Sequence, residues 1–266
     1  MILIKTSMKG YSALQYLLGL VFFVTHLSSC MIGGSNTAKK VISTCNVPSD
    51  QSGTISGHWL TTPIPLAFHE GDFNSSEINA IVAAVNTWNT FFQDSKQKTQ
   101  ELSVTTNGNI NMSTQSNPNT QGSLCSQSIL TGNTFTGSVV IYKLTSWPSS
   151  YPGAAIALTS FCTTKQSNYP SMYMAIMEIN YQNFFTRNQF PDLQSITLHE
   201  LGHVLGLDHT CSSSGAAGFP NCRDPNLNPS YTAASMYPTF YFSADGSGQV
   251  KQALGTNDES RVNCLY

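Results

Sequence analysis

Charged residues are scarce in this chain of 266 residues. Aspartate, glutamate, lysine and arginine make up 10% of the sequence, and the formal net charge is −2. No run of basic residues is present, so nucleic acid is not expected as a partner. Most of the polarity comes instead from Asn, Ser, Thr and Gln, a composition that favours an exported protein over a cytosolic one.

The sequence also has no Cys-x-x-Cys pair, which disfavours a zinc site built from thiolates. Six cysteines follow residue 44: Cys45, Cys125, Cys162, Cys211, Cys222 and Cys264. An even number in an exported chain predicts three disulfides, although the sequence does not fix their connectivity. The pair expected first is Cys211 with Cys222, because the two bracket a Gly/Ser-rich loop.

One long apolar run is present, and it lies at the N-terminus. Lys5 and Lys9 precede a largely apolar stretch from about Tyr11 to Leu27, which is the order of charge and hydrophobicity in a signal peptide. The run ends in Leu27-Ser-Ser-Cys30, which resembles a bacterial lipobox. That resemblance implies cleavage before Cys30 and lipidation of its thiol.

We therefore expect residues 1–29 to be a signal peptide and residues 30–56 a lipidated N-terminus and linker. The protein would then be exported to the bacterial cell envelope and held by lipid at the outer membrane or cell surface. A plain secretory signal, giving a secreted protein, and an uncleaved membrane anchor are the alternatives. All three export the chain.

The segment around residue 200 indicates a specific chemistry. His199 and His203 are four residues apart, so on a helix they lie on one face and can reach the same metal ion. Glu200 lies beside that ion rather than on it. Gly206 ends the helix and, lacking a Cβ, can adopt a positive φ that returns His209 to the ion. Three neutral nitrogens with an open fourth position are typical of a catalytic zinc site.

The whole pattern, His-Glu-x-x-His-x-x-Gly-x-x-His, resembles that of the metzincin zinc endopeptidases. Ala234-Ser-Met-Tyr-Pro238 resembles the methionine turn of the matrixin branch, with Met236 placed 27 residues after His209. The resemblance implies one catalytic zinc, held by the three histidines, and protein or peptide substrates. It also implies that Glu200 is the general base.

The resemblance further implies where a substrate would bind. The segment from Ala155 to Thr159 corresponds to the edge strand above a matrixin's cleft, and Thr239 to Phe242 to the wall of a specificity pocket. An ordinary core strand is the alternative for the first segment. The residues expected to contact substrate are Ala155, Ile156, Ala157, Leu158 and Tyr237.

Two features depart from the matrixin pattern. Residues 145–175 contain neither Asp nor His, the residue types that hold structural calcium and a second zinc in matrixins, so neither accessory ion is expected. Thr44 to Asp50, which includes Cys45, faintly resembles the propeptide segment whose thiolate blocks the zinc. The Arg and Gly of that family segment are absent here, so a disulfide at Cys45 is preferred over a latency switch.

The fold class expected is α/β (α+β), a metzincin or zincin-like catalytic domain. It would have a twisted mixed sheet, long helices, an active-site helix and a smaller irregular C-terminal lobe. The N-terminal subdomain would span residues 57–209 and the C-terminal subdomain residues 210–266, in a monomer. Strands are expected at 58–68 (an edge strand, because of its two prolines), 102–106, 138–144, 152–161 and 172–180.

Helices are expected at three places. The first runs from about Ser75 to Gln93 behind a capping box of Asn74 and Glu77. The second is the active-site helix, beginning at Pro191-Asp192, and the third opens at a capping box from Thr256 to Glu259. Between them, residues 107–137 are read as a surface insertion with a hairpin around Gly108.

The function expected is that of a zinc-dependent endopeptidase. An alternative from another class is a catalytically inactive, surface-anchored binding protein on the same scaffold. A zinc hydrolase acting on a non-peptide amide is a third. The presence of Glu200 favours an enzyme.

Overall fold

The computed structural model describes residues 3–5, 45–96, 101–119, 125, 138–164 and 170–266. These residues all fall within one compact unit. Cys30, most of the expected signal peptide and linker, and residues 120–124 and 126–137 of the expected insertion lie outside the described residues. None of the helices in the described ranges combines the length and apolar character needed to span a membrane.

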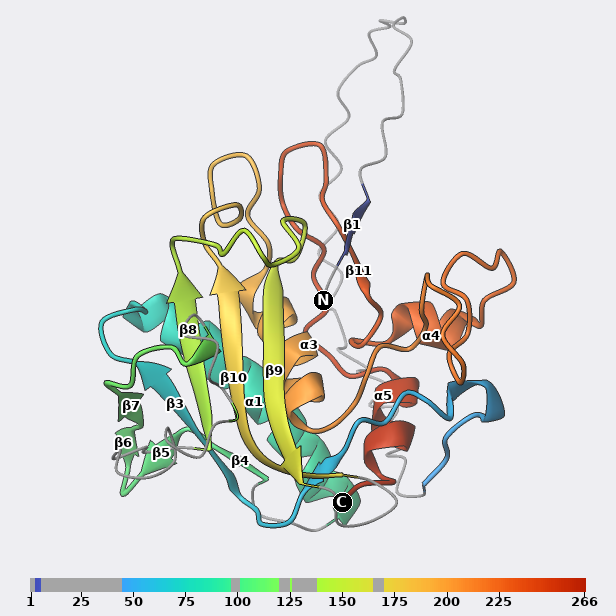
Figure 1. Ribbon diagram of the computed structural model, residues 1–266, viewed down its shortest axis with the longest axis horizontal. Coiled ribbons are helices and arrows are strands. Elements are labelled where there is room, and N and C mark those ends of the chain that lie inside the picture. The colour runs from blue at the N-terminus through green and yellow to red at the C-terminus, as the bar shows by residue number, and fades with distance from the viewer. Residues whose placement is uncertain (1–2, 6–44, 97–100, 120–124, 126–137, 165–169) are drawn as a thin grey trace, which may run out of the picture. The chain divides into compact units, whose positions relative to one another are not determined.

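A seven-stranded sheet forms the framework of this unit (Figure 1). The strand order is β2-β10-β8-β3-β4, with β7 also paired to β3 and β9 to β10. Every pairing is parallel except that of β9 with β10, so the sheet is mixed, as predicted. The strands are β2 (His58–Trp59), β3 (Ile64–His69), β4 (Leu102–Ser103), β7 (Met112–Ser113), β8 (Val139–Leu144), β9 (Ala157–Thr164) and β10 (Ser171–Asn180).

Two long helices cover one face of the sheet (Figure 1). Helix α1 spans Ser75–Lys96 and helix α3 spans Leu193–Val204. The predicted capping box of α1 is present, because the Glu77 amide donates to Asn74 Oδ1 at 3.0 Å and the Asn74 amide donates to Glu77 Oε2 at 2.9 Å. Helix α1 extends three residues beyond the predicted end.

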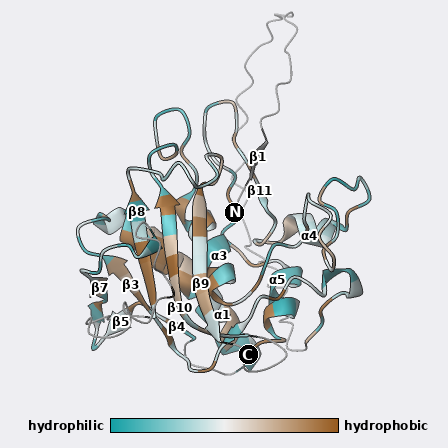
Figure 2. Ribbon diagram, in the orientation of Figure 1, coloured by the Kyte–Doolittle hydropathy of each residue, from teal (hydrophilic) through white to brown (hydrophobic). Residues whose placement is uncertain are grey.

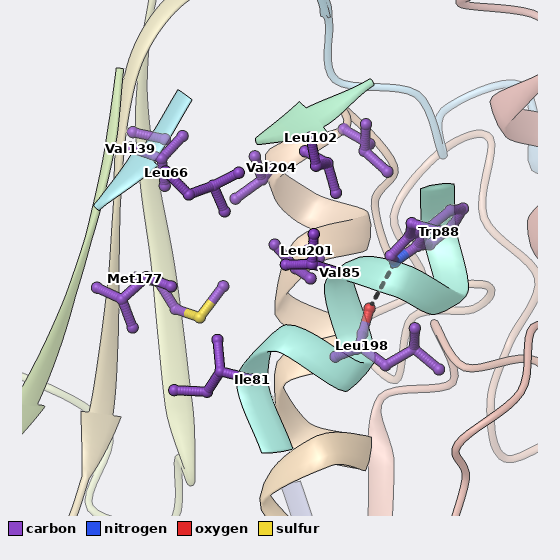
Figure 3. Close-up of a cluster of buried hydrophobic side chains, with 14 of the residues drawn as sticks. Leu66, Ile81, Val85, Trp88, Leu102, Val139, Met177, Leu198, Leu201 and Val204 are labelled. Atoms are coloured by element: carbon purple, nitrogen blue, oxygen red, sulfur yellow. Dashed lines mark hydrogen bonds between the residues drawn. The ribbon is translucent and has the colours of Figure 1, made fainter. Parts of the chain in front are cut away.

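The core lies between this face of the sheet and the two helices (Figure 3). Apolar side chains at helical spacing on α1 meet those of α3 and of the inward-facing strand positions. The indole nitrogen of Trp88 also donates to the Leu198 carbonyl at 3.0 Å, which ties the helices together. Among the residues drawn are Leu66, Ile81, Val85, Trp88, Leu102, Val139, Met177, Leu198, Leu201 and Val204. Figure 2 shows that the strands carry much of the hydrophobic colour, whereas the loops are largely hydrophilic.

The opposite face of the sheet carries a small apolar cluster and a buried polar network. Glu178 of β10 is completely buried there. Its carboxylate accepts from Asn117 Nδ2 at 2.6 Å, from Asn119 Nδ2 at 2.8 Å and from the Tyr151 hydroxyl at 3.2 Å. Burial, and then the charge of Glu178, raise the pKa of Tyr151 to about 12. Glu178 therefore holds Asn117 and Asn119 of the expected insertion against the sheet.

The remaining elements are short. The predicted hairpin is present as β5 (Thr105–Thr106) and β6 (Asn109–Ile110), which pair antiparallel around Gly108. A 3-10 helix covers Ser49–Gln51. The C-terminal region contains α4 (Pro229–Ala233), β11 (Thr239–Tyr241) and α5 (Thr256–Val262), and a strand β1 (Leu3–Lys5) pairs parallel with β11.

Two predictions about these elements were wrong. The segment 58–68 is not a single edge strand, because it divides into β2 and β3. β2 stands at the end of the strand order, but β3 has β8 on one side and β4 and β7 on the other. Pro65 is tolerated although it is paired with Ser103 of β4, because the amide directed to β4 is that of Ile64, which donates to the Glu101 carbonyl at 2.7 Å. On the other side, pairing with β8 begins only at Leu66, so the missing N–H removes no ladder hydrogen bond. Helix α5 is capped one residue earlier than predicted, since Asp258 accepts the Gly255 amide at 2.8 Å.

Candidate metal centre

Helix α3 places two imidazoles on the same buried face. The Asp192 side chain caps its N-terminus by accepting the Ser195 amide at 2.9 Å, which confirms the predicted start of this helix. His199 and His203 are both buried, and their ring centroids are 4.9 Å apart. The helix ends against Trp59, whose indole nitrogen donates to the Val204 carbonyl at 2.7 Å.

The chain reverses direction at Gly206. Its φ is +92°, a conformation that glycine adopts without strain. A Cβ at this position would also collide with the Gly57 carbonyl. The turn brings the His209 ring to within 5.2 Å of the His199 ring and 4.8 Å of the His203 ring, measured between centroids. Among the described residues, these three side chains form a group whose potential ligand atoms all lie within 4.8 Å of one another.

Two of these rings have their tautomer fixed by backbone carbonyls. His199 Nδ1 donates to the Ser235 carbonyl at 2.7 Å, and His203 Nδ1 donates to the Leu207 carbonyl at 2.8 Å. Each Nε2 is therefore left as an unprotonated acceptor. Both Nε2 atoms are buried without a partner, which in a folded protein calls for a ligand.

Burial also holds these imidazoles neutral. It lowers the pKa of His199 and of His209 well below the ordinary value, and that of His203 to about 3. A divalent metal ion binds the neutral form of imidazole. The donor set of three neutral nitrogens therefore fits zinc.

Met236 packs against the active-site helix α3. Its side chain is completely buried and occupies the space next to Gly202, where a Cβ would collide with the Met236 sulfur. Asp258 of α5 holds this turn by accepting the amide of Ser235 at 2.7 Å and that of Met236 at 3.1 Å. The carbonyl of Ser235 in turn receives His199 Nδ1–H. Helix α5 therefore supports the orientation of the first histidine through the methionine turn.

Glu200 is completely buried next to His199. Its Oε2 accepts a hydrogen bond of 2.7 Å from the Thr159 hydroxyl, whereas its Oε1 is buried without a partner. Burial raises the pKa of Glu200 above its ordinary value, a change that suits a group that both accepts and releases a proton. The sequence placed Thr159 only at the end of the expected edge strand. Its contact with Glu200 was not predicted, because the two residues are 41 positions apart and tertiary packing joins them.

A family model decides the classification. The model described as matrixin matches residues 64–226, which include α1, α3 and the strands of the seven-stranded sheet other than β2. The chain belongs to the matrixin family. No curated protein matches the sequence.

In this matrixin, β9 is an edge strand within the described part of the chain, where its only strand partner is β10. The strand begins at Ala157, however, and both preceding residues are buried and already bonded to Asn180. The side-chain amide of Asn180 donates to the Ala155 carbonyl at 2.9 Å, and the backbone amide of Asn180 donates to the Ile156 carbonyl at 2.9 Å.

A cavity of about 670 Å³ lies beside the third histidine. Its walls include His209, the predicted Tyr237, and both Thr239 and Tyr241 of β11. Phe242, which was expected to continue the wall, instead stacks on Phe184 with ring centroids 6.1 Å apart. The opposite side is formed by the loop from Cys211 to Cys222.

The predicted disulfide between Cys211 and Cys222 is confirmed, and two more join Cys45 to Cys264 and Cys125 to Cys162. The pairing of Cys45 overturns the alternative in which its thiolate blocks the zinc, because a disulfide sulfur offers no thiolate. Three disulfides indicate an exported protein.

Proposed function

We propose that this matrixin is a zinc-dependent endopeptidase in which His199, His203 and His209 bind one catalytic zinc. One observation carries the proposal: Nε2 of His199, Nε2 of His203 and Oε1 of Glu200 are all buried without a hydrogen-bond partner. A zinc ion held by the three rings would supply a water of lowered pKa and polarise the scissile carbonyl.

The chemistry of the chain's own residues centres on Glu200. Oε1 takes a proton from the attacking water, whose oxygen forms the new bond to the carbonyl carbon. Oε1 of Glu200 then gives the proton to the leaving nitrogen as the carbon–nitrogen bond breaks. The second proton of the water also ends on the leaving nitrogen, so the products are a carboxylate and an ammonium group, and Glu200 returns to its initial ionised state.

The peptide would bind in extended form between β9 and β11. In the antiparallel register, Leu158 faces Glu178 with its backbone groups directed to β10, so those of Ala157 and Thr159 are directed away from β10. They can therefore pair with an added strand. The pairing of Leu3–Lys5 with β11 supports the idea that the edge of β11 accepts an extended segment. Tyr237 and the adjacent cavity would then receive a substrate side chain.

The test is cleavage of unfolded protein substrates by the purified full chain, with the products mapped by mass spectrometry. We expect internal peptide bonds to be cut, and a zinc chelator to abolish cutting. Glu200→Ala should retain zinc and lose cleavage, while Glu70→Ala, an exposed residue, should match the wild type. Binding of proteins without any cleavage would instead support the inactive binding-protein alternative. Hydrolysis confined to non-peptide amides would support the third.

We also propose the location that the N-terminal sequence predicts. Residues 1–29 would direct export, Cys30 would carry the lipid, and residues 30–56 would link it to the catalytic unit. The three disulfides support export but not the anchor. Replacing Cys30 with Ala should move the protein from the membrane fraction to the soluble fraction. Equal membrane association of the variant would contradict lipid anchoring.

A further inference from the structure

The edge strand makes direct contact with the proposed general base. Thr159 Oγ1 donates to Glu200 Oε2 at 2.7 Å and lies 3.4 Å from the Glu200 carbonyl oxygen. The first contact has the short length of a hydroxyl bonded to a carboxylate. It connects β9 to the centre of α3, two elements that are distant in sequence.

The hydroxyl interrupts an apolar row. On a strand, alternate residues share a face, so Thr159 shares its face with Ala157 and Phe161, which both pack in the core between sheet and helices. Ser160 is on the other face, where its hydroxyl accepts from Asn119 Nδ2 at 3.1 Å. An apolar residue of the same shape would satisfy the packing at position 159. The hydroxyl therefore serves Glu200 rather than the core.

The hydrogen bond distinguishes the two carboxylate oxygens. Oε2 is engaged by Thr159, so Oε1 is the oxygen left to accept a proton from water. Threonine suits this task because its branched Cβ restricts χ1 and thus fixes the direction of the hydroxyl. Without the bond, a carboxylate on a two-carbon side chain can rotate about its terminal torsion.

We propose that Thr159 is a positioning residue that orients the Glu200 carboxylate for proton transfer, an inference that rests on the proposed function. Thr159 keeps its proton on Oγ1 and donates it to Oε2 throughout the reaction. Oε1 alone takes the proton from water and passes it to the leaving nitrogen. No group other than water and the peptide is consumed.

The test compares Thr159→Val, Thr159→Ser and the control Thr163→Val in the full-length protein. Thr163 is an exposed residue of the same strand, so the control makes the same chemical change away from Glu200. We expect Thr159→Val to lower kcat about 10- to 100-fold with KM within about twofold, because a hydrogen bond to a charged group is lost. Thr159→Ser retains the donor and should stay within about fivefold of the wild type. Zinc content should be unchanged.

A crystal structure of Thr159→Val gives a readout that is independent of turnover. We expect the Glu200 carboxylate to occupy more than one orientation in the variant and a single one in the wild type. A single, unchanged orientation, or a kcat within about twofold of the wild type, would overturn the inference. Loss of zinc in both Thr159→Val and Thr159→Ala would also overturn it, because the role would then be structural.

The outcomes separate this inference from the proposed function. If Thr159→Val is fully active while Glu200→Ala is inactive, the endopeptidase assignment stands and the positioning role fails. If the wild type cleaves no peptide bond, the proposed function fails, and the orientation of Glu200 in the two crystal structures still decides the role of Thr159.

Discussion

The side chain of Met236 fills the space that a Cβ at Gly202 would need. Gly202 lies directly before His203, and three residues after His199, on helix α3. The methionine turn therefore meets the active-site helix between its two histidines, and the close approach depends on the absence of a side chain at residue 202.

Replacing Gly202 with Ala should therefore disturb both stability and metal binding. We expect a loss of about 1–3 kcal/mol in the free energy of unfolding, as for other overpacked cores, and weaker zinc binding in competition with a chromophoric chelator. Gly153→Ala is the matched control, since nothing lies within 4 Å of a Cβ there. Equal behaviour of the two variants would show that the contact with Met236 is not tight.

Glu178 should stabilise the segment that covers the outer face of the sheet. Removing its carboxylate in Glu178→Ala leaves the amides of Asn117 and Asn119 and the hydroxyl of Tyr151 without this acceptor. We expect the variant to lose about 3 kcal/mol of stability and to be cut faster by an added protease between residues 113 and 119. Unchanged proteolysis of that segment would contradict this role.

The disulfide between Cys45 and Cys264 joins residues 219 positions apart. Closing such a long loop constrains the unfolded chain, so the double variant Cys45→Ser, Cys264→Ser should be less stable by about 5 kcal/mol in the chain-entropy model. Its specific activity at low temperature should not exceed that of the wild type. A marked increase in activity of the unprocessed protein would revive the latency switch.

The stability of the N-terminus of α1 should depend on pH through Glu77. Although burial raises its pKa, the hydrogen bonds from Lys143 and the Asn74 backbone outweigh burial and lower the pKa below 4.5. The ion pair with Lys143 is 2.8 Å long. A depressed carboxyl pKa contributes stability above the unfolded pKa, and this is lost as pH falls through the folded pKa.

We therefore expect Glu77→Gln to be less stable than the wild type by about 1 kcal/mol at pH 7. The difference should shrink as the pH falls below 4.5, as measured by urea unfolding across that range. Lys143→Met, which removes the partner, should show a reduced pH effect in the same window. A difference that grows on acidification would reverse the assigned sign.

Local patterns predicted the parts of this molecule that depend on neighbours in sequence. The spacing of His199, His203 and His209 specified one helix and one glycine turn, and Asn74 with Glu77 marked the start of α1. The partners that complete the site could not be predicted, because tertiary packing sets them. Thr159 of β9 bonds to Glu200 of α3, 41 residues further along the chain. Asp258 of α5 bonds to the amide of Met236, 22 residues before it.

Residue composition predicted the type and the limits of two strands, β3 and β9, less well. Pro63 and Pro65 indicated an edge strand, yet Pro65 precedes the first residue paired with β8, and on the β4 side the Ile64 amide makes the hydrogen bond. The strand expected at 152–161 is observed as β9 at Ala157–Thr164. Ala155 and Ile156 have the apolar character of a strand, but their carbonyls bind Asn180 before the regular ladder begins.

The proposed function requires His199, His203 and His209 to share one zinc ion with an open fourth position. X-ray absorption at the zinc edge of the purified wild-type protein measures this coordination. We expect one zinc per chain with three imidazole nitrogens at about 2.0–2.1 Å and one oxygen from water. A first shell containing sulfur, or a shell without three imidazoles, would contradict it.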